Sequence, residues 1–128
     1  MTVQALTAEE FDRTISDSDI VVVDFWAPWC GPCLGFAPVF EQVADENADI
    51  TFAKVNTDEE QALSAHFRVR SIPTLMVFRE QVLVFEQAGA LPKGALTDLL
   101  SQVRNLDMAE IRRGAVPYDA GDDAGPAQ

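Results

Sequence analysis

The sequence predicts an α/β domain, because segments of strand character alternate with segments of helical periodicity along most of the chain. Strand-like segments at 3–5, 20–26 and 51–56 are each followed by a helix-like segment, which gives a β-α-β-α-β-α order. Two more strand-like segments, 74–78 and 82–85, are joined by three residues, and so short a link permits only an antiparallel hairpin. A chain of 128 residues can bury the core of one such domain.

The second strand and the helix before it have distinct signals. Thr7 and Glu10 fit a capping box, in which the hydroxyl accepts from the Glu10 amide and the Glu10 carboxylate reaches back. Segment 20–26 is apolar, β-branched and aromatic without alternation, as in a central strand that is covered on both faces. Asp24 is the exception within this strand.

A helix from about Pro32 to about Glu46 follows the second strand. Its first turn accommodates Pro32, whereas Pro38 lies in the helix interior, removes an amide donor and clashes with the preceding turn. We therefore expect a kink near Pro38. The inward stripe is Phe36, Val39, Phe40 and Val43.

Two further helices are expected later in the chain. Asp58, Glu59 and Glu60 place three acids at the start of one of them, where the helix dipole favours negative charge. The last long helix spans about Lys93 to Asn105. Its inward stripe is Leu96, Leu99, Leu100, Val103 and Leu106.

The character of the sequence changes at Asp107. Residues 107–110 can cap one more short helix, which Gly114 would end. Residues 115–128 are mostly Ala, Gly, Pro and Asp, and we expect them to be disordered. The predicted division is a domain at 1–106 and a C-terminal extension at 107–128.

Charge and targeting signals exclude several classes of protein. With 9 Lys and Arg against 21 Asp and Glu, the net charge of −12 disfavours binding to nucleic acid or to anionic membranes. The first ten residues lack the basic and apolar regions of a signal peptide, and no apolar run approaches the roughly 18 residues of a membrane span. We therefore expect a cytoplasmic protein, in which a disulfide is more often transient and catalytic than structural.

The two cysteines of the chain lie at the junction between the second strand and the next helix, in Trp29-Cys30-Gly31-Pro32-Cys33. This spacing brings two sulfurs within bonding reach, while the amides of the first helical turn point at the first sulfur and favour a thiolate. A Cys-x-x-Cys motif at such a junction indicates a dithiol redox centre. The alternative is a zinc site, but structural zinc takes four ligands and the chain adds only His66.

The chain resembles the thioredoxin family. The residues that carry the resemblance are the run 24–33, Pro38, Lys54, Ile72-Pro73-Thr74 and Gly89-Ala90, in family order and at family-like spacings over about residues 3–105. The resemblance implies a thioredoxin fold, with a central mixed sheet of five strands flanked by four helices. It also implies a cis peptide between Ile72 and Pro73.

The resemblance further implies catalytic roles. Cys30 would be the attacking thiolate and Cys33 the resolving thiol. Asp24 would transfer protons with Cys33, and Lys54 would pair with Asp24. The alternatives are an Asp24 at the strand end that makes local hydrogen bonds and a Lys54 that faces solvent.

Substrate contacts follow from the same resemblance. The expected set is Trp29, Gly31, Pro32, Ile72, Pro73, Gly89 and Ala90, with the Ile72 backbone pairing with an extended substrate. Three positions depart from the family. Leu34 replaces a common lysine, which alters the charge near the thiolate or broadens the apolar docking surface. Arg68 and Gln81 stand where the family usually has glycine, so the usual hairpin turn is in doubt.

The expected function is a general protein-disulfide reductase, recharged by a thioredoxin reductase with electrons from NADPH. We expect no bound cofactor and no metal, a monomer, and disulfide-containing client proteins as substrates. Two alternatives remain. One is a disulfide oxidant or isomerase, although Gly31-Pro32 between the cysteines resembles reductases. The other is a thioredoxin-fold binding subunit without redox turnover.

Overall fold

The computed structural model describes residues 2–114. It contains ten regular elements, which confirm the predicted order of strands and helices. In chain order they are β1 (Val3–Ala5), α1 (Ala8–Asp17), β2 (Ile20–Trp26), α2 (Gly31–Asp45), β3 (Thr51–Asn56), α3 (Gln61–His66), β4 (Thr74–Arg79), β5 (Val82–Ala88), α4 (Lys93–Arg104) and α5 (Met108–Gly114).

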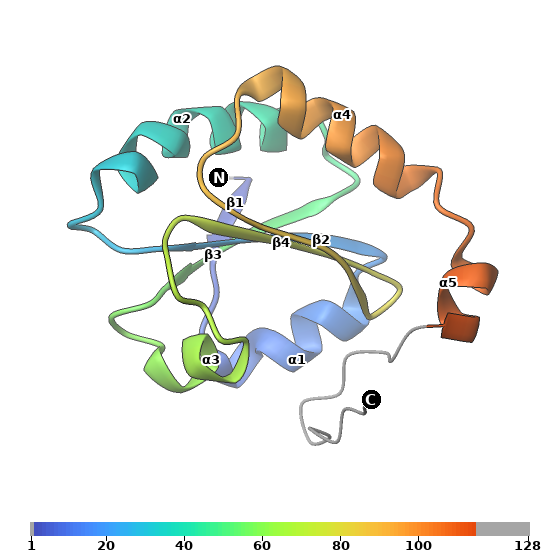
Figure 1. The fold of residues 1–128 in the computed structure, drawn as a ribbon, viewed down its shortest axis with the longest axis horizontal. Coiled ribbons are helices and arrows are strands. Elements are labelled where there is room, and N and C mark those ends of the chain that lie inside the picture. The colour runs from blue at the N-terminus through green and yellow to red at the C-terminus, as the bar shows by residue number, and fades with distance from the viewer. Residues whose placement is uncertain (1, 115–128) are drawn as a thin grey trace.

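The strands form one mixed sheet in the order β1-β3-β2-β4-β5. The strands β1, β3 and β2 run parallel, while β4 pairs antiparallel with both β2 and β5. Helices α2 and α4 cover one face of the sheet and α1 and α3 the other, with α5 beyond the end of α4 (Figure 1). The five-stranded sheet between helices and the antiparallel hairpin are therefore confirmed.

The central strand β2 divides the core into two layers. Ile20 and Val22 pack in a cluster with residues of α2 and α4, whereas Val21, Val23 and Phe25 pack in a second cluster with residues of α1 and α3. Successive side chains of a strand point to opposite faces, so an apolar strand without alternation has to be covered on both sides. The carboxyl end of this strand leads directly into the cysteine turn.

Helix α2 begins and ends within one residue of its predicted limits and continues through Pro38. Phe36, Phe40 and Val43 of the predicted stripe are buried, and Val39 packs against them at the edge. The kink expected near Pro38 stays a prediction.

The predicted capping box at Thr7 is wrong. Thr7 is the N-cap of α1, but its side chain makes no capping hydrogen bond. The Glu60 carboxylate instead accepts from the Ala8 amide at 2.9 Å, so an acid distant in sequence satisfies this helix start. Asp58 and Glu59 correspondingly precede α3 rather than occupying its first turn, and Glu60 is the N-cap of that helix.

The β4–β5 hairpin forms without the glycine that its turn favours. Glu80 and Gln81 connect the strands with φ values of 51° and 69°, the positive values at both central positions that a type I′ turn requires. Arg68, at the other position where glycine was expected, also has a positive φ of 57°. Side chains in this region are disfavoured because Cβ approaches the following carbonyl oxygen.

The hairpin turn also holds the end of the described chain. The Arg79 guanidinium donates to the carbonyl oxygens of Val103 and Leu106 at 2.8 and 3.0 Å, which satisfies the open end of α4. Arg112 of α5 pairs with the Glu80 carboxylate at 2.5 Å.

The short helix predicted after Asp107 is confirmed as α5, and the Asp107 carboxylate accepts from the Glu110 amide at 3.1 Å. The division after residue 106 stays a prediction, and the expected disorder of 115–128 lies outside the described residues.

We predict that Gln81→Gly stabilises the protein. The left-handed conformation costs a non-glycine residue about 1–2 kcal/mol, and the greater chain entropy of glycine offsets about 0.5–1 kcal/mol of this. The free energy of unfolding in urea should therefore rise by about 0.5–1 kcal/mol. The matched control is Gln87→Gly in β5, where the backbone is extended and the same change should destabilise. A less stable Gln81→Gly protein contradicts the prediction.

Candidate active site

The cysteine turn is fixed between the end of β2 and the start of α2. The Cys30 amide donates to the Ala27 carbonyl oxygen at 3.1 Å, which closes the turn after the strand. Cys30 is the N-cap of α2 and forms a disulfide with Cys33. The structure therefore represents the oxidised form of the dithiol.

The first turn of α2 directs its amides at the Cys30 sulfur. The Cys33 amide donates to Cys30 Sγ at 3.1 Å, in the geometry that a serine or aspartate oxygen normally takes at an N-cap. A negative charge at this position also benefits from the positive end of the helix dipole. In the reduced protein the same amide and dipole favour a thiolate on Cys30.

A second segment meets the dithiol through its backbone. The Ile72 carbonyl oxygen lies 3.7 Å from Cys30 Sγ, and the Ile72-Pro73 peptide is cis, as the resemblance implied. The Gly89 amide donates to the Pro73 carbonyl oxygen at 2.7 Å, which brings the loop after β5 to the same place. Gly89 has a φ of 101°, a conformation that suits glycine.

The structure thus brings together the segments predicted to contact substrate. Gly31 and Pro32 are exposed on the first turn of α2, and Ala90 is exposed beside Gly89. Trp29 is exposed directly before Cys30. These residues, the half-buried Ile72 and the buried Pro73 form the rim of the site, and the Ile72 carbonyl oxygen is the rim atom that lies 3.7 Å from Cys30 Sγ.

Sequence reasoning missed two residues beside this rim. Asp58 accepts two hydrogen bonds from the Trp29 indole Nε1, at 3.0 and 3.3 Å, and so sets the position of the indole. Arg70 lines a groove of about 190 Å³ together with Trp29 and Ile72. The sequence indicates Asp58 only as an acid at a helix start, because no local pattern points to Trp29, its partner 29 residues away.

Asp24 is buried in the middle of the sheet, with 1% of its surface exposed. Neither carboxyl oxygen has a hydrogen-bond partner within residues 2–114. Burial raises the pKa of Asp24 from 3.8 to about 7, because desolvation penalises the charged form, and the charge of Lys54 opposes part of that rise. The carboxyl can therefore gain or lose a proton near neutral pH, which is what a general acid or base requires.

The predicted pairing of Lys54 with Asp24 stays a prediction, and the structure shows how the two side chains lie. The two residues are register partners on neighbouring parallel strands, but no hydrogen bond or ion pair joins them. The Lys54 ammonium lies instead 4.2 Å from the centre of the Trp26 ring, as a cation–π contact, and its charge acts on Asp24 from a distance. A contact pair inside the sheet would have to remove both charges from water, which this arrangement avoids.

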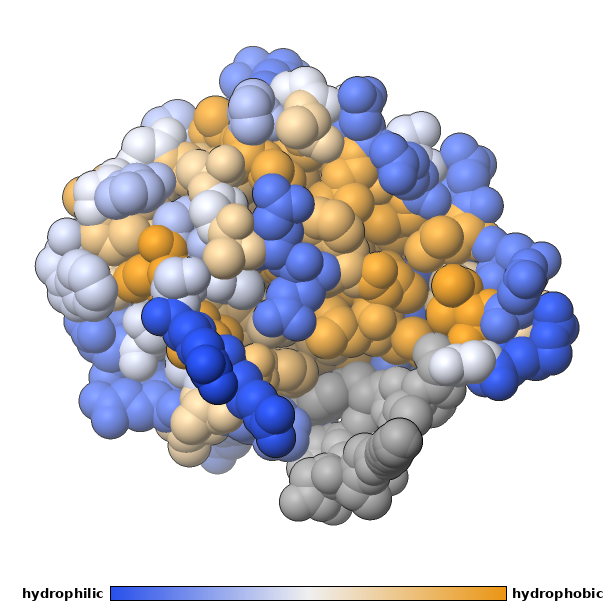
Figure 2. Space-filling model, viewed as in Figure 1, coloured by the Kyte–Doolittle hydropathy of each residue, from blue (hydrophilic) through white to orange (hydrophobic). Residues whose placement is uncertain are grey.

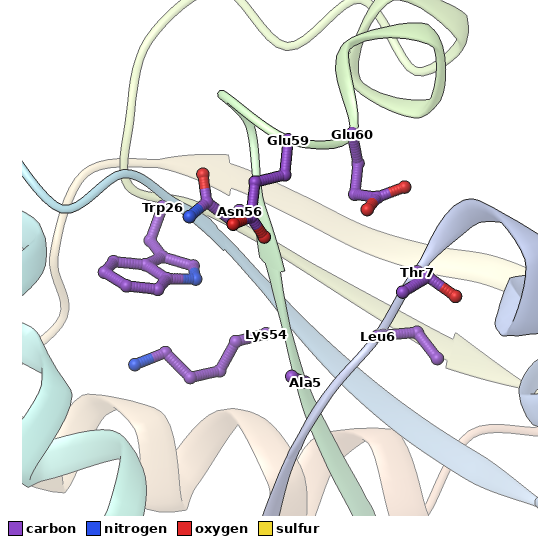
Figure 3. A pocket seen from close by; sticks show the side chains of 8 residues that line it. All are labelled: Ala5, Leu6, Thr7, Trp26, Lys54, Asn56, Glu59 and Glu60. Atoms are coloured by element: carbon purple, nitrogen blue, oxygen red, sulfur yellow. The ribbon is translucent and has the colours of Figure 1, made fainter.

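Lys54 and Trp26 form part of the wall of an open pocket of about 280 Å³ (Figure 3). Its other walls come from the end of β1, the start of α1 and the segment before α3. Glu59 and Glu60 contribute carboxylates to this pocket, so acidic groups line it together with Lys54.

No cluster of three or more His, Cys, Asp or Glu side chains within residues 2–114 is arranged to hold a metal ion. The same part of the chain contains no helix that is both long and apolar enough to cross a bilayer.

Comparison with known proteins identifies the family, since residues 2–102 match the thioredoxin family model. The chain belongs to the thioredoxin family. It is 51% identical to a Streptomyces coelicolor protein named "Putative thioredoxin 2" over 90% of this chain and 86% of that protein. A thioredoxin of Haemophilus influenzae is 45% identical over 73% of this chain and 89% of its own length. The solved structure of a mutant thioredoxin from Halobacterium salinarum has a TM-score of 0.76 at 39% identity, covering 81% of this chain and 92% of that one.

The family and the site agree on one chemistry. Thioredoxins are protein-disulfide oxidoreductases, and Cys30 and Cys33 form the redox-active pair of the family motif. The chain is therefore a protein-disulfide reductase of the thioredoxin class. The thioredoxin fold expected from the sequence is confirmed as well.

We predict that Asp24 makes stability depend on pH. Because the folded pKa of about 7 lies above the value of 3.8 for an exposed carboxyl, the folded state keeps a proton that the unfolded state has lost between these pH values. The free energy of unfolding should then fall as pH rises from about 4 to about 7. Asp24→Asn should remove this fall. Near pH 8 its free energy of unfolding should exceed that of wild type by up to about 4 kcal/mol.

Urea unfolding of both proteins across this pH window checks the prediction. Asp98→Asn, which removes an exposed carboxylate on α4, is the matched control and should keep the wild-type pH dependence. The same pH dependence in Asp24→Asn and wild type contradicts the assignment.

Proposed function

We propose that the protein is a general reductase of client disulfides in which Cys30 attacks and Cys33 resolves. The observation that carries this proposal is the Cys30 sulfur itself, which accepts a hydrogen bond from the Cys33 amide at 3.1 Å and lies 3.7 Å from the carbonyl oxygen of the half-buried Ile72. One side of the sulfur thus favours a thiolate, and the other offers main-chain groups to a client. Main-chain contacts suit clients of many sequences.

In the first step the Cys30 thiolate attacks one sulfur of a client disulfide. A bond forms between that sulfur and Cys30 Sγ, the client S–S bond breaks, and the other client sulfur leaves as a thiolate. The product is a mixed disulfide between client and protein. An extended client segment lies along the Ile72 backbone and is bounded by Trp29 on one side and Gly89 on the other.

In the second step Cys33 attacks Cys30 Sγ and releases the second client thiolate. Cys33 has 2% of its surface exposed, so its thiol proton needs an acceptor inside the protein. Asp24 provides that acceptor, directly or through water, because its pKa of about 7 matches the working pH. The client has then gained two electrons, and its two thiolates take up the proton that Asp24 passes on and one from solvent, while the protein holds the Cys30–Cys33 disulfide.

The cycle closes when a separate thioredoxin reductase, supplied by NADPH, reduces that disulfide. Thioredoxins as a family work with such a reductase and with disulfide-containing clients. A monomer in the cytoplasm, with no nucleic acid or membrane partner, fits the acidic charge of −12.

We predict that substitution of either cysteine separates the two steps. Cys30→Ser should lose insulin-disulfide reduction with NADPH and a thioredoxin reductase by at least about 1,000-fold, because the attacking thiolate is gone and Cys33, with 2% of its surface exposed, is out of reach of a client disulfide. Cys33→Ser should instead accumulate mixed disulfides between Cys30 and client proteins, and reducing agents should free the clients from them. Activity that survives in Cys30→Ser would overturn the assigned nucleophile, and trapping by Cys30→Ser rather than Cys33→Ser would exchange the roles.

We also predict that Asp24→Asn slows resolution more than attack. The breakdown of a preformed mixed disulfide should slow by about 10–100-fold near pH 7, a typical share of general-base catalysis. The defect should shrink above about pH 9, where a cysteine loses its proton without help. Stopped-flow measurement of both steps checks this.

Lys54→Gln is the matched variant for this experiment. This variant keeps the Asp24 carboxyl but removes a charge that lowers the pKa of Asp24. The pH profile of its resolution rate should therefore move to higher pH. Equal slowing of attack and resolution in Asp24→Asn would exclude the proton-transfer role.

A further inference from the structure

Two apolar side chains flank the dithiol at positions that normally contact each other. Since Cys30 is the N-cap of α2, Trp29 is the residue before the cap and Leu34 is the fourth residue of the helix. Apolar residues at these two positions commonly pack together as a hydrophobic staple. Here Trp29 is 70% exposed and Leu34 is 53% exposed, so the staple is open.

The indole is held away by a specific contact. Trp29 Nε1 donates to both carboxylate oxygens of Asp58, which precedes α3, and this directs the ring toward the α3 side of the rim. Leu34 belongs to neither of the two main core clusters, although its amide continues the helix with a hydrogen bond to the Cys30 carbonyl oxygen at 3.0 Å. The two apolar side chains thus remain accessible, one directly before Cys30 and one in the first turn after it.

No other large apolar side chain within residues 2–114 is exposed in this way. Figure 2 shows further apolar side chains on the face of the molecule seen in that view. The partly buried residues of β5 that reach the surface, Leu83, Val84 and Phe85, already pack against the core. Trp29 and Leu34 therefore differ from the rest of the apolar surface in having more than half of their surface exposed.

Thiol–disulfide exchange at Cys30 requires a client to cover the surface around this cysteine. Cys30 is only 4% exposed, so a client sulfur reaches it only when the client surface presses against the surrounding rim. Leu34 lies four residues after Cys30, one helical turn away on the same face of α2. A client that approaches Cys30 therefore covers Leu34 as well.

We propose that Trp29 and Leu34 form the two sides of a client-recognition site for an apolar side chain next to the client's reactive cysteine. Leu34 is its specificity-determining residue. The client side chain takes the place of the missing staple contact and removes both apolar surfaces from water. This inference rests on the proposed function and adds the class of client sequence that the site prefers.

The charge of this surface supports an apolar occupant over an acidic one. The first turn of α2, residues 31–34, carries no charged side chain, and the chain as a whole has a net charge of −12. An acidic residue beside the client cysteine therefore meets no cation in this turn of α2, whereas Arg70 lines the groove on the Trp29 side. The binding of such an acidic residue is opposed by the overall field of the protein.

Three disulfide-linked peptides test the proposal, identical except for Leu, Asn or Asp directly after the cysteine. The fully reduced protein is mixed with each peptide, and separately with 2-hydroxyethyl disulfide, which is too small to reach both sides of the site. The selectivity is the ratio of the peptide rate constant to that of 2-hydroxyethyl disulfide. For wild type it should be about fivefold to tenfold higher with Leu than with Asn, and lowest with Asp.

The variants assign this preference to Leu34. Leu34→Gln, which keeps the length but not the apolar character, should lower the selectivity for the Leu peptide about fivefold. Leu34→Met should retain most of it. Ala109→Gln, an exposed change on α5 at the far end of the molecule in Figure 1, should leave it unchanged.

Three other outcomes would each contradict a specific statement made above. If wild type reduces the three peptides equally, the recognition site is wrong while the proposed function stands. If Leu34→Gln slows 2-hydroxyethyl disulfide as much as the Leu peptide, Leu34 acts on the thiol chemistry and is not a recognition residue. If wild type reduces none of the disulfides, the proposed function itself fails.

Discussion

The burial of β2 is the constraint on which the rest of the structure depends. A strand that is apolar on both faces has to lie inside a sheet with helices on both sides, and this places its carboxyl end where the chain turns into α2. In open α/β sheets, binding sites gather beyond the carboxyl ends of the strands. The same burial forces Asp24 into an apolar setting, so the interaction that stabilises the fold also raises the pKa of this carboxyl to about 7.

The position of Lys54 preserves that property of Asp24. In direct contact with Asp24, the ammonium would strongly favour the carboxylate and move its pKa well below neutrality. A carboxyl that is always ionised accepts a proton poorly at pH 7. Because the ammonium lies over the Trp26 ring, its charge only moderates the effect of burial. The contact that the sequence led us to expect would therefore have made the site a weaker proton acceptor.

The elements and the dithiol could be predicted because burial periodicity and one specific motif determine them. The strand at 20–26 needs cover on both faces, and the cysteine spacing fixes a helix start. The contacts that the sequence does not determine are those of polar side chains whose partners are distant in sequence. Glu60 reaches Ala8, Asp58 reaches Trp29, and Lys54 faces Trp26 rather than its register partner. No local pattern decides among such partners, because each depends on how the layers pack around the sheet.

The start of α2 also bears on the direction of electron flow. Whatever stabilises the Cys30 thiolate stabilises the reduced protein and makes the disulfide a stronger oxidant. Here the stabilising groups on α2 are one amide at 3.1 Å and the helix dipole, since residues 31–34 include no cation. Because Leu34 follows Cys33, the thiolate has no charged partner on this turn, and the reduced form is stabilised less than a cation there would stabilise it. This favours the release of electrons to clients, so the uncharged first turn of α2 supports reduction rather than oxidation.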